Sequence, residues 1–122
     1  MYELTKQFRF DAAHTLEREI EAEGSRRIHG HSYRARVTLR GKPDPVSGMI
    51  IDTSLLALKL SQARDALDHR FLDEINDLGP GTMENLCAYI WRKLEDDIPT
   101  LYSVTVLRDS TEDQVTYFGE TA

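Results

Sequence analysis

The chain has 122 residues, of which 40% are hydrophobic and 30% charged, and its formal net charge is −6. This length predicts a single domain over residues 1–122, because two ordinary domains would need a longer chain. The acidic excess argues against nucleic-acid binding, which depends on basic side chains. No apolar run approaches the roughly 20 residues that span a bilayer, and the first ten residues do not resemble a signal peptide. The lack of a long apolar run predicts no membrane contact. Because the single cysteine, Cys87, cannot form an internal disulfide, we also expect a cytoplasmic protein.

The apolar pattern predicts four strands and two helices along the chain. The clearest strand, residues 32–41, alternates apolar and polar side chains without a break. In chain order we expect a strand over 2–10, a polar loop with a helical turn over 15–27, a strand over 32–41, a helix capped by Ser54 with help from Asp52, a helix capped by Thr82, and strands over 101–108 and 114–118. This order predicts an α+β fold in which two helices cover one face of a four-stranded antiparallel sheet. Because such a sheet has two open edges, we also expect it to oligomerise.

Three of the four histidines have a spacing typical of a metal site. His29 and His31 are two residues apart, so in a strand their imidazoles lie on the same side. His14 follows the first strand, which would pair beside the second. Three neutral imidazoles leave a fourth coordination position open, as in catalytic zinc sites. The sequence therefore predicts Zn²⁺ on these histidines, although two histidines in this spacing are, on their own, more often unrelated surface residues.

The fourth histidine, His69, directly follows Asp68 near the predicted end of the first helix. A neighbouring carboxylate can fix the tautomer of an imidazole and raise its basicity, which general acid–base catalysis requires. The alternative is an ordinary aspartate beside a histidine that the helix dipole favours. We therefore treat Asp68 and His69 as candidate catalytic residues.

Three more side chains are candidates for binding a polar heterocycle. Thr82 and Glu84 stand at the start of the second predicted helix, and Asp109 ends the third predicted strand. A hydroxyl and carboxylates can accept hydrogen bonds from an amidine-like N–H edge. The alternatives are a helix cap for Thr82, a favourable helix-dipole contact for Glu84 and a turn-initiating role for Asp109.

Five short motifs follow one another in a single register over nearly the whole chain. They are FDAAH at 10–14, HGHSY at 29–33, GMIID at 48–52, LDH at 67–69 and TMENL at 82–86. Together they resemble the 6-pyruvoyl-tetrahydropterin synthase family. The short length is similar to that of its bacterial branch, the 6-carboxy-tetrahydropterin synthases of queuosine and deazapurine biosynthesis.

The resemblance implies a tunnelling fold whose trimers form a barrel and stack in pairs as a homohexamer. It implies a zinc ion on the three histidines and 7,8-dihydroneopterin triphosphate as the substrate. A cysteine thiolate would accept a proton with the help of Asp68 and His69. A glutamate near the C-terminal hairpin would grip the pterin ring, assisted by Thr82 and Glu84.

Two positions depart from that family pattern: Ser25 stands where the cysteine is expected, and Asp109 stands where the ring-gripping glutamate is expected. A serine hydroxyl is a far weaker base than a thiolate, and aspartate is one methylene shorter than glutamate. Three interpretations of Ser25 are open: a divergent enzyme with His69 as the base, a pterin-binding paralogue with little activity, or a serine introduced to trap a ligand. We favour the divergent enzyme because the four histidines and Asp68 are all present.

The sequence thus predicts a zinc-dependent lyase that converts 7,8-dihydroneopterin triphosphate, or a close relative, to a 6-substituted tetrahydropterin such as 6-carboxy-5,6,7,8-tetrahydropterin. Its pathway would be queuosine, deazapurine or tetrahydropterin biosynthesis. The alternative is a catalytically impaired or non-catalytic pterin- or purine-binding paralogue that keeps the metal site.

Overall fold

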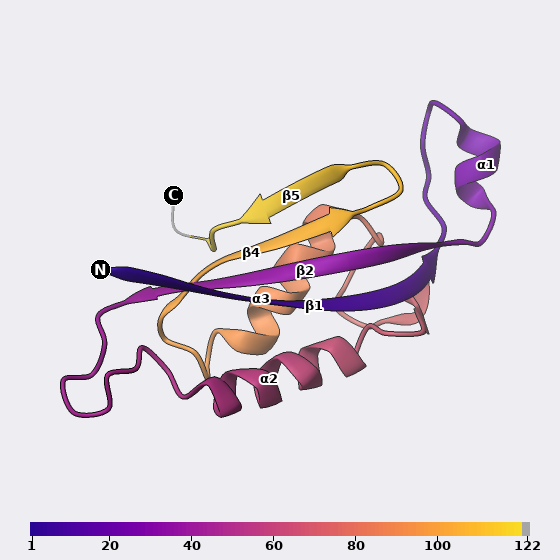
Figure 1. Ribbon diagram of the computed structural model, residues 1–122. Helices are drawn as coiled ribbons and strands as arrows, with labels where there is room; N and C mark the ends of the chain where they lie inside the picture. The colour runs from indigo at the N-terminus through magenta and orange to yellow at the C-terminus, as the bar shows by residue number, and fades with distance from the viewer. Residues whose placement is uncertain (121–122) are drawn as a thin grey trace.

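The computed structural model describes residues 1–120 and shows a sheet of five strands packed against two helices (Figure 1). The elements are β1 (Tyr2–His14), α1 (Ala22–Arg26), β2 (His29–Gly41), α2 (Thr53–Asp65), β3 (Arg70–Phe71), the short 3₁₀ helix η1 (Leu72–Glu74), α3 (Met83–Leu94), β4 (Leu101–Arg108) and β5 (Asp113–Tyr117). Among these described residues, no helix is both long and apolar enough to cross a membrane. The predicted domain end at residue 122 lies outside the described residues.

The strand order in the sheet is β3-β1-β2-β4-β5. All neighbours are antiparallel except β3, which pairs with β1 in parallel. The predicted α+β class is therefore confirmed, while the predicted number of four strands is wrong. The extra strand, β3, contains only Arg70 and Phe71, which is too short for an alternating pattern to show in the sequence.

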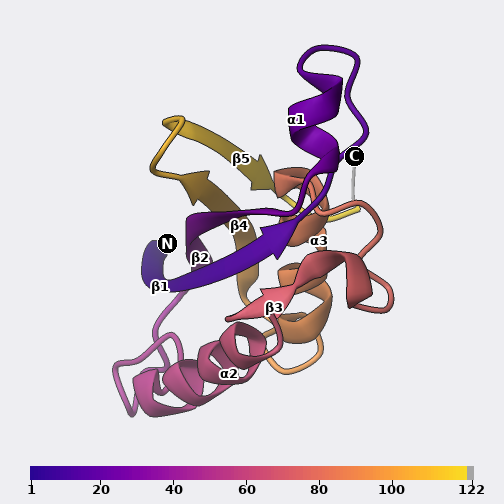
Figure 2. The same ribbon diagram turned by 90° about the vertical axis from the view of Figure 1, so that its right-hand side faces the viewer.

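Strands β1 and β2 are longer than the sequence predicted. The predicted boundaries were residues 10 and 32, whereas β1 continues to His14 and β2 begins at His29. These two histidines stand opposite each other as the last pair of the β1–β2 ladder. Between them lies α1, the helical turn expected within residues 15–27. It projects beyond the strand ends, apart from α2 and α3 (Figures 1 and 2).

Side chains alternate between two different faces of the sheet, as the strand geometry requires. One face, which we call the helix-covered face, packs against α2 and α3 (Figure 2). The other, the open face, carries polar and charged side chains. The strand residues buried on the helix-covered face are Phe10, Ala12, Tyr33, Ala35, Val37, Leu39, Val104 and Val106, and the helices bury Leu56, Leu60, Ala63, Leu86, Ile90 and Leu94 against them.

Both long helices begin at a side-chain cap. The carboxylate of Asp52 accepts a hydrogen bond from the Ser54 amide and caps α2, so the capping role expected of Asp52 is confirmed and that expected of Ser54 is wrong. Thr82 caps α3 as predicted, because its hydroxyl accepts a hydrogen bond from the Asn85 amide at 3.1 Å. The cap at Thr82 fixes the start of α3 next to the ends of β1 and β2, where the histidines lie.

Candidate functional site

The three histidines of the predicted metal site converge at one end of the helix-covered face. The ring centroids of His14 and His29 are 4.5 Å apart, those of His14 and His31 are 4.9 Å apart, and those of His29 and His31 are 5.1 Å apart. One ring nitrogen of each lies within 4.8 Å of the other two. We call these three residues the histidine triad.

Backbone carbonyls orient two rings of the triad. Nδ1 of His14 is 2.8 Å from the carbonyl oxygen of Gly81, and Nδ1 of His29 is 2.8 Å from that of Arg27. Because a carbonyl oxygen only accepts hydrogen bonds, each Nδ1 carries a hydrogen, and in a neutral ring Nε2 then keeps its lone pair. The two Nε2 atoms are 2.9 Å apart. Two lone pairs that face each other so closely fit a shared cation.

The third ring presents the same kind of nitrogen without a partner. Within residues 1–120, Nε2 of His31 is buried and has no hydrogen-bond partner. A buried acceptor without a partner is costly, so the site is suited to a bound group. Burial, followed by the charge of Arg108, lowers the pKa of His31 to about 4, and burial also lowers the pKa of His14. Both rings are therefore neutral at pH 7, the form that binds a metal.

Gly81 is a supporting residue that the sequence analysis missed. A Cβ atom at this position would lie 3.2 Å from the Cβ atoms of both His14 and Leu72. The glycine therefore lets the backbone before α3 approach β1 closely enough for its carbonyl to hold His14. In the sequence, residues 79–81 indicated only a break between two helices.

The predicted pair of Asp68 and His69 is present. Nδ1 of His69 is 2.9 Å from one carboxylate oxygen of Asp68, which also pairs with Arg64 at 2.9 Å. The other oxygen accepts the backbone N–H of Asp11 at 2.9 Å, and this hydrogen bond is the main reason why the pKa of Asp68 is lowered. The His69 amide in turn donates to the Asp11 carbonyl at 2.7 Å. Asp11, which the sequence analysis did not single out, thus fixes both residues.

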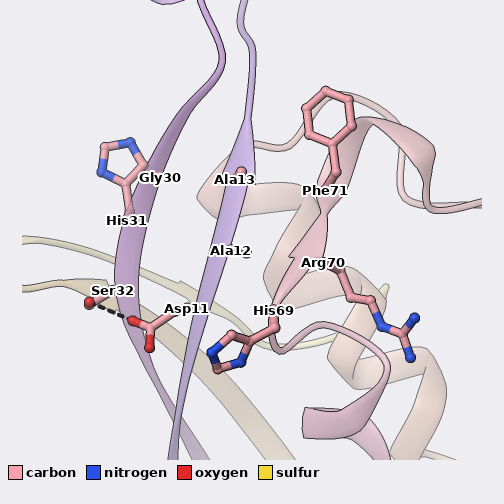
Figure 3. Close-up of a pocket in the computed structure, with 9 residues that line it drawn as sticks. All are labelled: Asp11, Ala12, Ala13, Gly30, His31, Ser32, His69, Arg70 and Phe71. Atoms are coloured by element: carbon pink, nitrogen blue, oxygen red, sulfur yellow. Dashed lines mark hydrogen bonds between the residues drawn. The ribbon is translucent and has the colours of Figure 1, made fainter.

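The Asp68–His69 pair and the histidine triad remain two separate groups. A pocket of about 590 Å³ runs along β1 and β3 and is lined by both His31 and His69 (Figure 3). The side chain of His69 is 78% exposed, and its imidazole and that of His31 do not point toward one another in Figure 3. The structure therefore brings the catalytic candidates to a pocket that borders the triad without joining them to it.

Two other pockets adjoin the triad and share one wall. The α1 pocket, of about 350 Å³, is lined by Ser25, His29 and His31 among others. The α3 pocket, of about 500 Å³, is lined by Thr82 and Glu84 among others. The residues that line both pockets are Leu16, Arg18 and Arg108.

The predicted catalytic position Ser25 lies in α1 and is 5% exposed. Its hydroxyl donates a hydrogen bond to the carbonyl of Ala22 at 3.0 Å. The side chain that could supply a thiolate, Cys87, is buried in the core, and burial raises its pKa to about 12. Neither residue provides a strong base at neutral pH.

Asp109 does not share a pocket with Thr82 and Glu84. Its carboxylate oxygens are both 3.1 Å from Nε of Arg34, a residue on the open face. None of the three pockets described above is lined by Asp109. The preceding residue, Arg108, lines two of them. Because side chains alternate along a strand, a shift of one residue moves a side chain to the opposite face of the sheet.

Comparisons with known proteins agree with this fold. The family model for 6-pyruvoyl tetrahydropterin synthase matches residues 3–120. The chain is 37% identical over 118 residues to 6-carboxy-5,6,7,8-tetrahydropterin synthase of Synechocystis sp., which covers 91% of this chain and 89% of the relative. It is 35% identical over 98 residues to 6-pyruvoyl tetrahydrobiopterin synthase of Homo sapiens, which covers 75% of this chain and 67% of the relative.

A solved structure, 6-pyruvoyl tetrahydropterin synthase of Caenorhabditis elegans, superposes with a TM-score of 0.86 and 31% sequence identity. The match covers 98% of this chain and 96% of that one, so the fold is the tunnelling fold of these enzymes. The relatives support a tetrahydropterin synthase activity in pterin metabolism. This chain belongs to the 6-pyruvoyl tetrahydropterin synthase family.

Proposed function

We propose that this chain is a zinc-dependent lyase that converts 7,8-dihydroneopterin triphosphate, or a close relative, to a 6-substituted tetrahydropterin such as 6-carboxy-5,6,7,8-tetrahydropterin. The observation that supports it most is the convergence of three imidazoles on one point, two of which, His14 and His31, have lowered pKa values. We place the reaction in queuosine, deazapurine or tetrahydropterin biosynthesis in the cytoplasm, and treat residues 1–122 as one domain.

The residues present fit a zinc ion. Imidazole nitrogens suit zinc, and three protein ligands with an open fourth position are typical of its catalytic sites. His14, His29 and His31 would hold the ion. A zinc ion there would supply Lewis-acid chemistry, making the side-chain hydroxyls of the substrate more acidic.

Among the candidates of this chain, His69 is best placed to move protons. Asp68 binds its Nδ1 and so leaves Nε2 free to accept a proton from the substrate. Ser25, which stands at the cysteine position, is a poor base whose hydroxyl is already bonded to Ala22. We therefore assign the base to His69 and give Ser25 a role in shaping the α1 pocket.

The side chain of His69 is exposed, and its imidazole does not point toward His31 of its own chain in Figure 3. We therefore propose that the Asp68–His69 pair serves a substrate that is bound at the triad of a second copy. A homohexamer built from two trimers would provide that neighbour, and the exposed strands at both edges of the sheet are suited to pairing between copies.

We propose that the ring of the substrate binds in the α3 pocket next to the triad. There the carboxylate of Glu84 can accept ring N–H groups, and Thr82 presents a hydroxyl beside it. We assign no ring contact to Asp109, because it is paired with Arg34 outside these pockets.

The experiment is to incubate the zinc-loaded protein with 7,8-dihydroneopterin triphosphate and identify the products by mass spectrometry. We expect consumption of the substrate, release of a carbon fragment and formation of a 6-substituted tetrahydropterin. His69→Asn is the sharpest variant, because residue 69 has a φ of 58° and asparagine tolerates that backbone well. It should retain zinc and lose about 100-fold or more in turnover.

Asp109→Asn is the matched control and should turn over at the rate of the unmodified protein. The alternative function is a pterin- or purine-binding paralogue without turnover, which the engaged Ser25 and the buried Cys87 favour. Tight binding of reduced pterins with no product, in a protein with full metal content, would establish that alternative. In that case Ser25→Cys tests whether the missing thiolate is the cause of the inactivity, because this variant should then show turnover.

A further inference from the structure

Arg108 is a basic residue on the face of the sheet that carries the triad. It stands directly opposite Tyr33 in the β2–β4 ladder, and Tyr33 follows His29 and His31 at intervals of two. All four side chains therefore belong to the helix-covered face. Arg108 lines both the α1 pocket and the α3 pocket, so it stands between the triad and the residues Thr82 and Glu84.

Arg108 forms only long hydrogen bonds with the rest of the protein. Its Nε is 3.3 Å from the Thr111 hydroxyl, and one terminal nitrogen is 3.4 Å from the Asp113 carboxylate. These distances are at the long end of the range for hydrogen bonds. A guanidinium carries five N–H donors in a planar fork. The side chain is only 17% exposed and lines both pockets, so a ligand bound there could reach the remaining donors.

A second observation at the same place is the hydroxyl of Tyr33. Tyr33 is 1% exposed, and within the described residues 1–120 its hydroxyl has no hydrogen-bond partner. Burial raises the pKa of Tyr33, and the guanidinium of Arg108 opposes that rise through its charge and through its closeness to the hydroxyl. Because the hydroxyl forms no hydrogen bond of ordinary geometry, it is suited to pairing with a bound molecule beside Arg108. The hydroxyl and the guanidinium thus extend the polar end of the helix-covered face beyond the triad.

The side chains around the α1 pocket carry more positive than negative charge, which also favours a ligand with oxygen acceptors. Its lining includes two guanidiniums, Arg18 and Arg108, and one carboxylate, Glu21. This excess is positive before any metal is bound, and a divalent cation on the triad would increase it. A ligand group with N–H donors would face other N–H donors here and form no hydrogen bonds. A ligand group with oxygen acceptors would form hydrogen bonds with the guanidiniums.

We infer that Arg108 determines which ligands the site accepts, by binding an oxygen-acceptor group of the bound pterin rather than an N–H edge. A guanidinium pairs well with a phosphate, a carboxylate, or a carbonyl next to a ring nitrogen acceptor. A pterin offers the last of these on its ring, and its triphosphate offers the first. This inference rests on the proposed function in that the ligand is a pterin.

The test measures the affinity of the metal-loaded protein for neopterin and for neopterin triphosphate, two oxidised probes used here as non-reacting ligands. Arg108→Gln should weaken binding of at least one probe by about 10-fold or more. Arg34→Gln is the matched control, because it removes a guanidinium from the open face, and it should change both affinities less than about 2-fold. Metal content and circular dichroism are recorded for every variant.

The pattern of loss identifies the acceptor. Weaker binding of both probes by a similar factor assigns Arg108 to the ring carbonyl, and weaker binding of the triphosphate alone assigns it to a phosphate. If Arg108→Gln does not fold, Arg108→Lys keeps the charge but loses the planar fork, and should still weaken binding measurably.

The inference is overturned if a folded, metal-loaded Arg108 variant binds both probes as tightly as the Arg34 control. The proposed function fails in a different way, because then the unmodified protein itself binds neither probe.

Discussion

The two faces of the sheet differ in whether their polar side chains have partners within the protein. On the open face, polar residues find partners across neighbouring strands, as in the hydrogen bond between Thr5 and Thr38 and the ion pair between Arg34 and Asp109. On the helix-covered face, Nε2 of His31 and the hydroxyl of Tyr33 are buried without a partner in the described part of the chain.

This difference separates groups that stabilise the fold from groups kept for a ligand. Cross-strand pairs at an exposed face each contribute little and need nothing further. Buried polar atoms without partners are a cost that the rest of the core must offset. This cost falls on two adjacent inward positions of β2, His31 and Tyr33, and indicates where a bound metal and its substrate would supply the missing contacts.

The strongest test of this comparison is a pair of neighbouring substitutions in β2. His31→Ala removes an inward imidazole, and we expect zinc affinity to fall by more than about 100-fold, since even changes behind the ligands cost 10- to 100-fold. Ser32→Ala removes an outward hydroxyl bonded to Asp11 and should leave the metal content unchanged. Metal content after dialysis against a chelator distinguishes the two variants. Equal retention of zinc in both would contradict the assignment of the faces.

A smaller effect is expected at Asp68, the best-connected polar group outside the helix-covered face. Asp68→Asn loses the charge that pairs with Arg64 and His69, and should lower the free energy of unfolding by about 1 to 2 kcal/mol at pH 7. The hydrogen bond from Asp11 holds the pKa of Asp68 below its ordinary value of 3.8.

The pH dependence of that effect has a defined sign. Because the pKa is lowered in the folded state, the contribution of Asp68 is fully present above pH 3.8 and is lost as the pH falls through the lowered pKa. The difference in urea stability between the unmodified protein and Asp68→Asn should therefore narrow as the pH falls below 3.8. A difference that stays constant from pH 7 to pH 3 would mean that shape rather than charge is responsible.

The sequence predicted the parts of the site that depend on short-range geometry. The spacing of His29 and His31 fixes their common side in any strand, and Asp68 and His69 are neighbours in the chain. The capping role of Thr82 is likewise a local property of a helix start. For each of these, a pattern of a few residues is enough to determine the arrangement.

What the sequence did not predict depends on contacts between distant segments. Gly81 approaches His14 across the gap between α3 and β1, and Asp11 binds Asp68 across 57 positions of the chain. Whether Arg108 or Asp109 faces the ligand pockets depends on a shift of one residue in the register of β4. That register is set by the pairing of β4 with β2 and not by the two residues themselves. Composition could not have decided it, since both residues are charged and adjacent.

The smallest effect is expected from the residue that the family resemblance placed on the pterin ring. Asp109→Asn removes one partner of an ion pair whose side chains are 31% and 47% exposed, so the free energy of unfolding should change by less than about 1 kcal/mol. The affinity for neopterin should stay the same, because the carboxylate is turned toward Arg34 on the open face. Titration of neopterin into the folded variant measures this directly. A 10-fold loss of affinity would show that Asp109 leaves Arg34 to bind the ligand, and the division between the two faces would no longer hold at the end of β4.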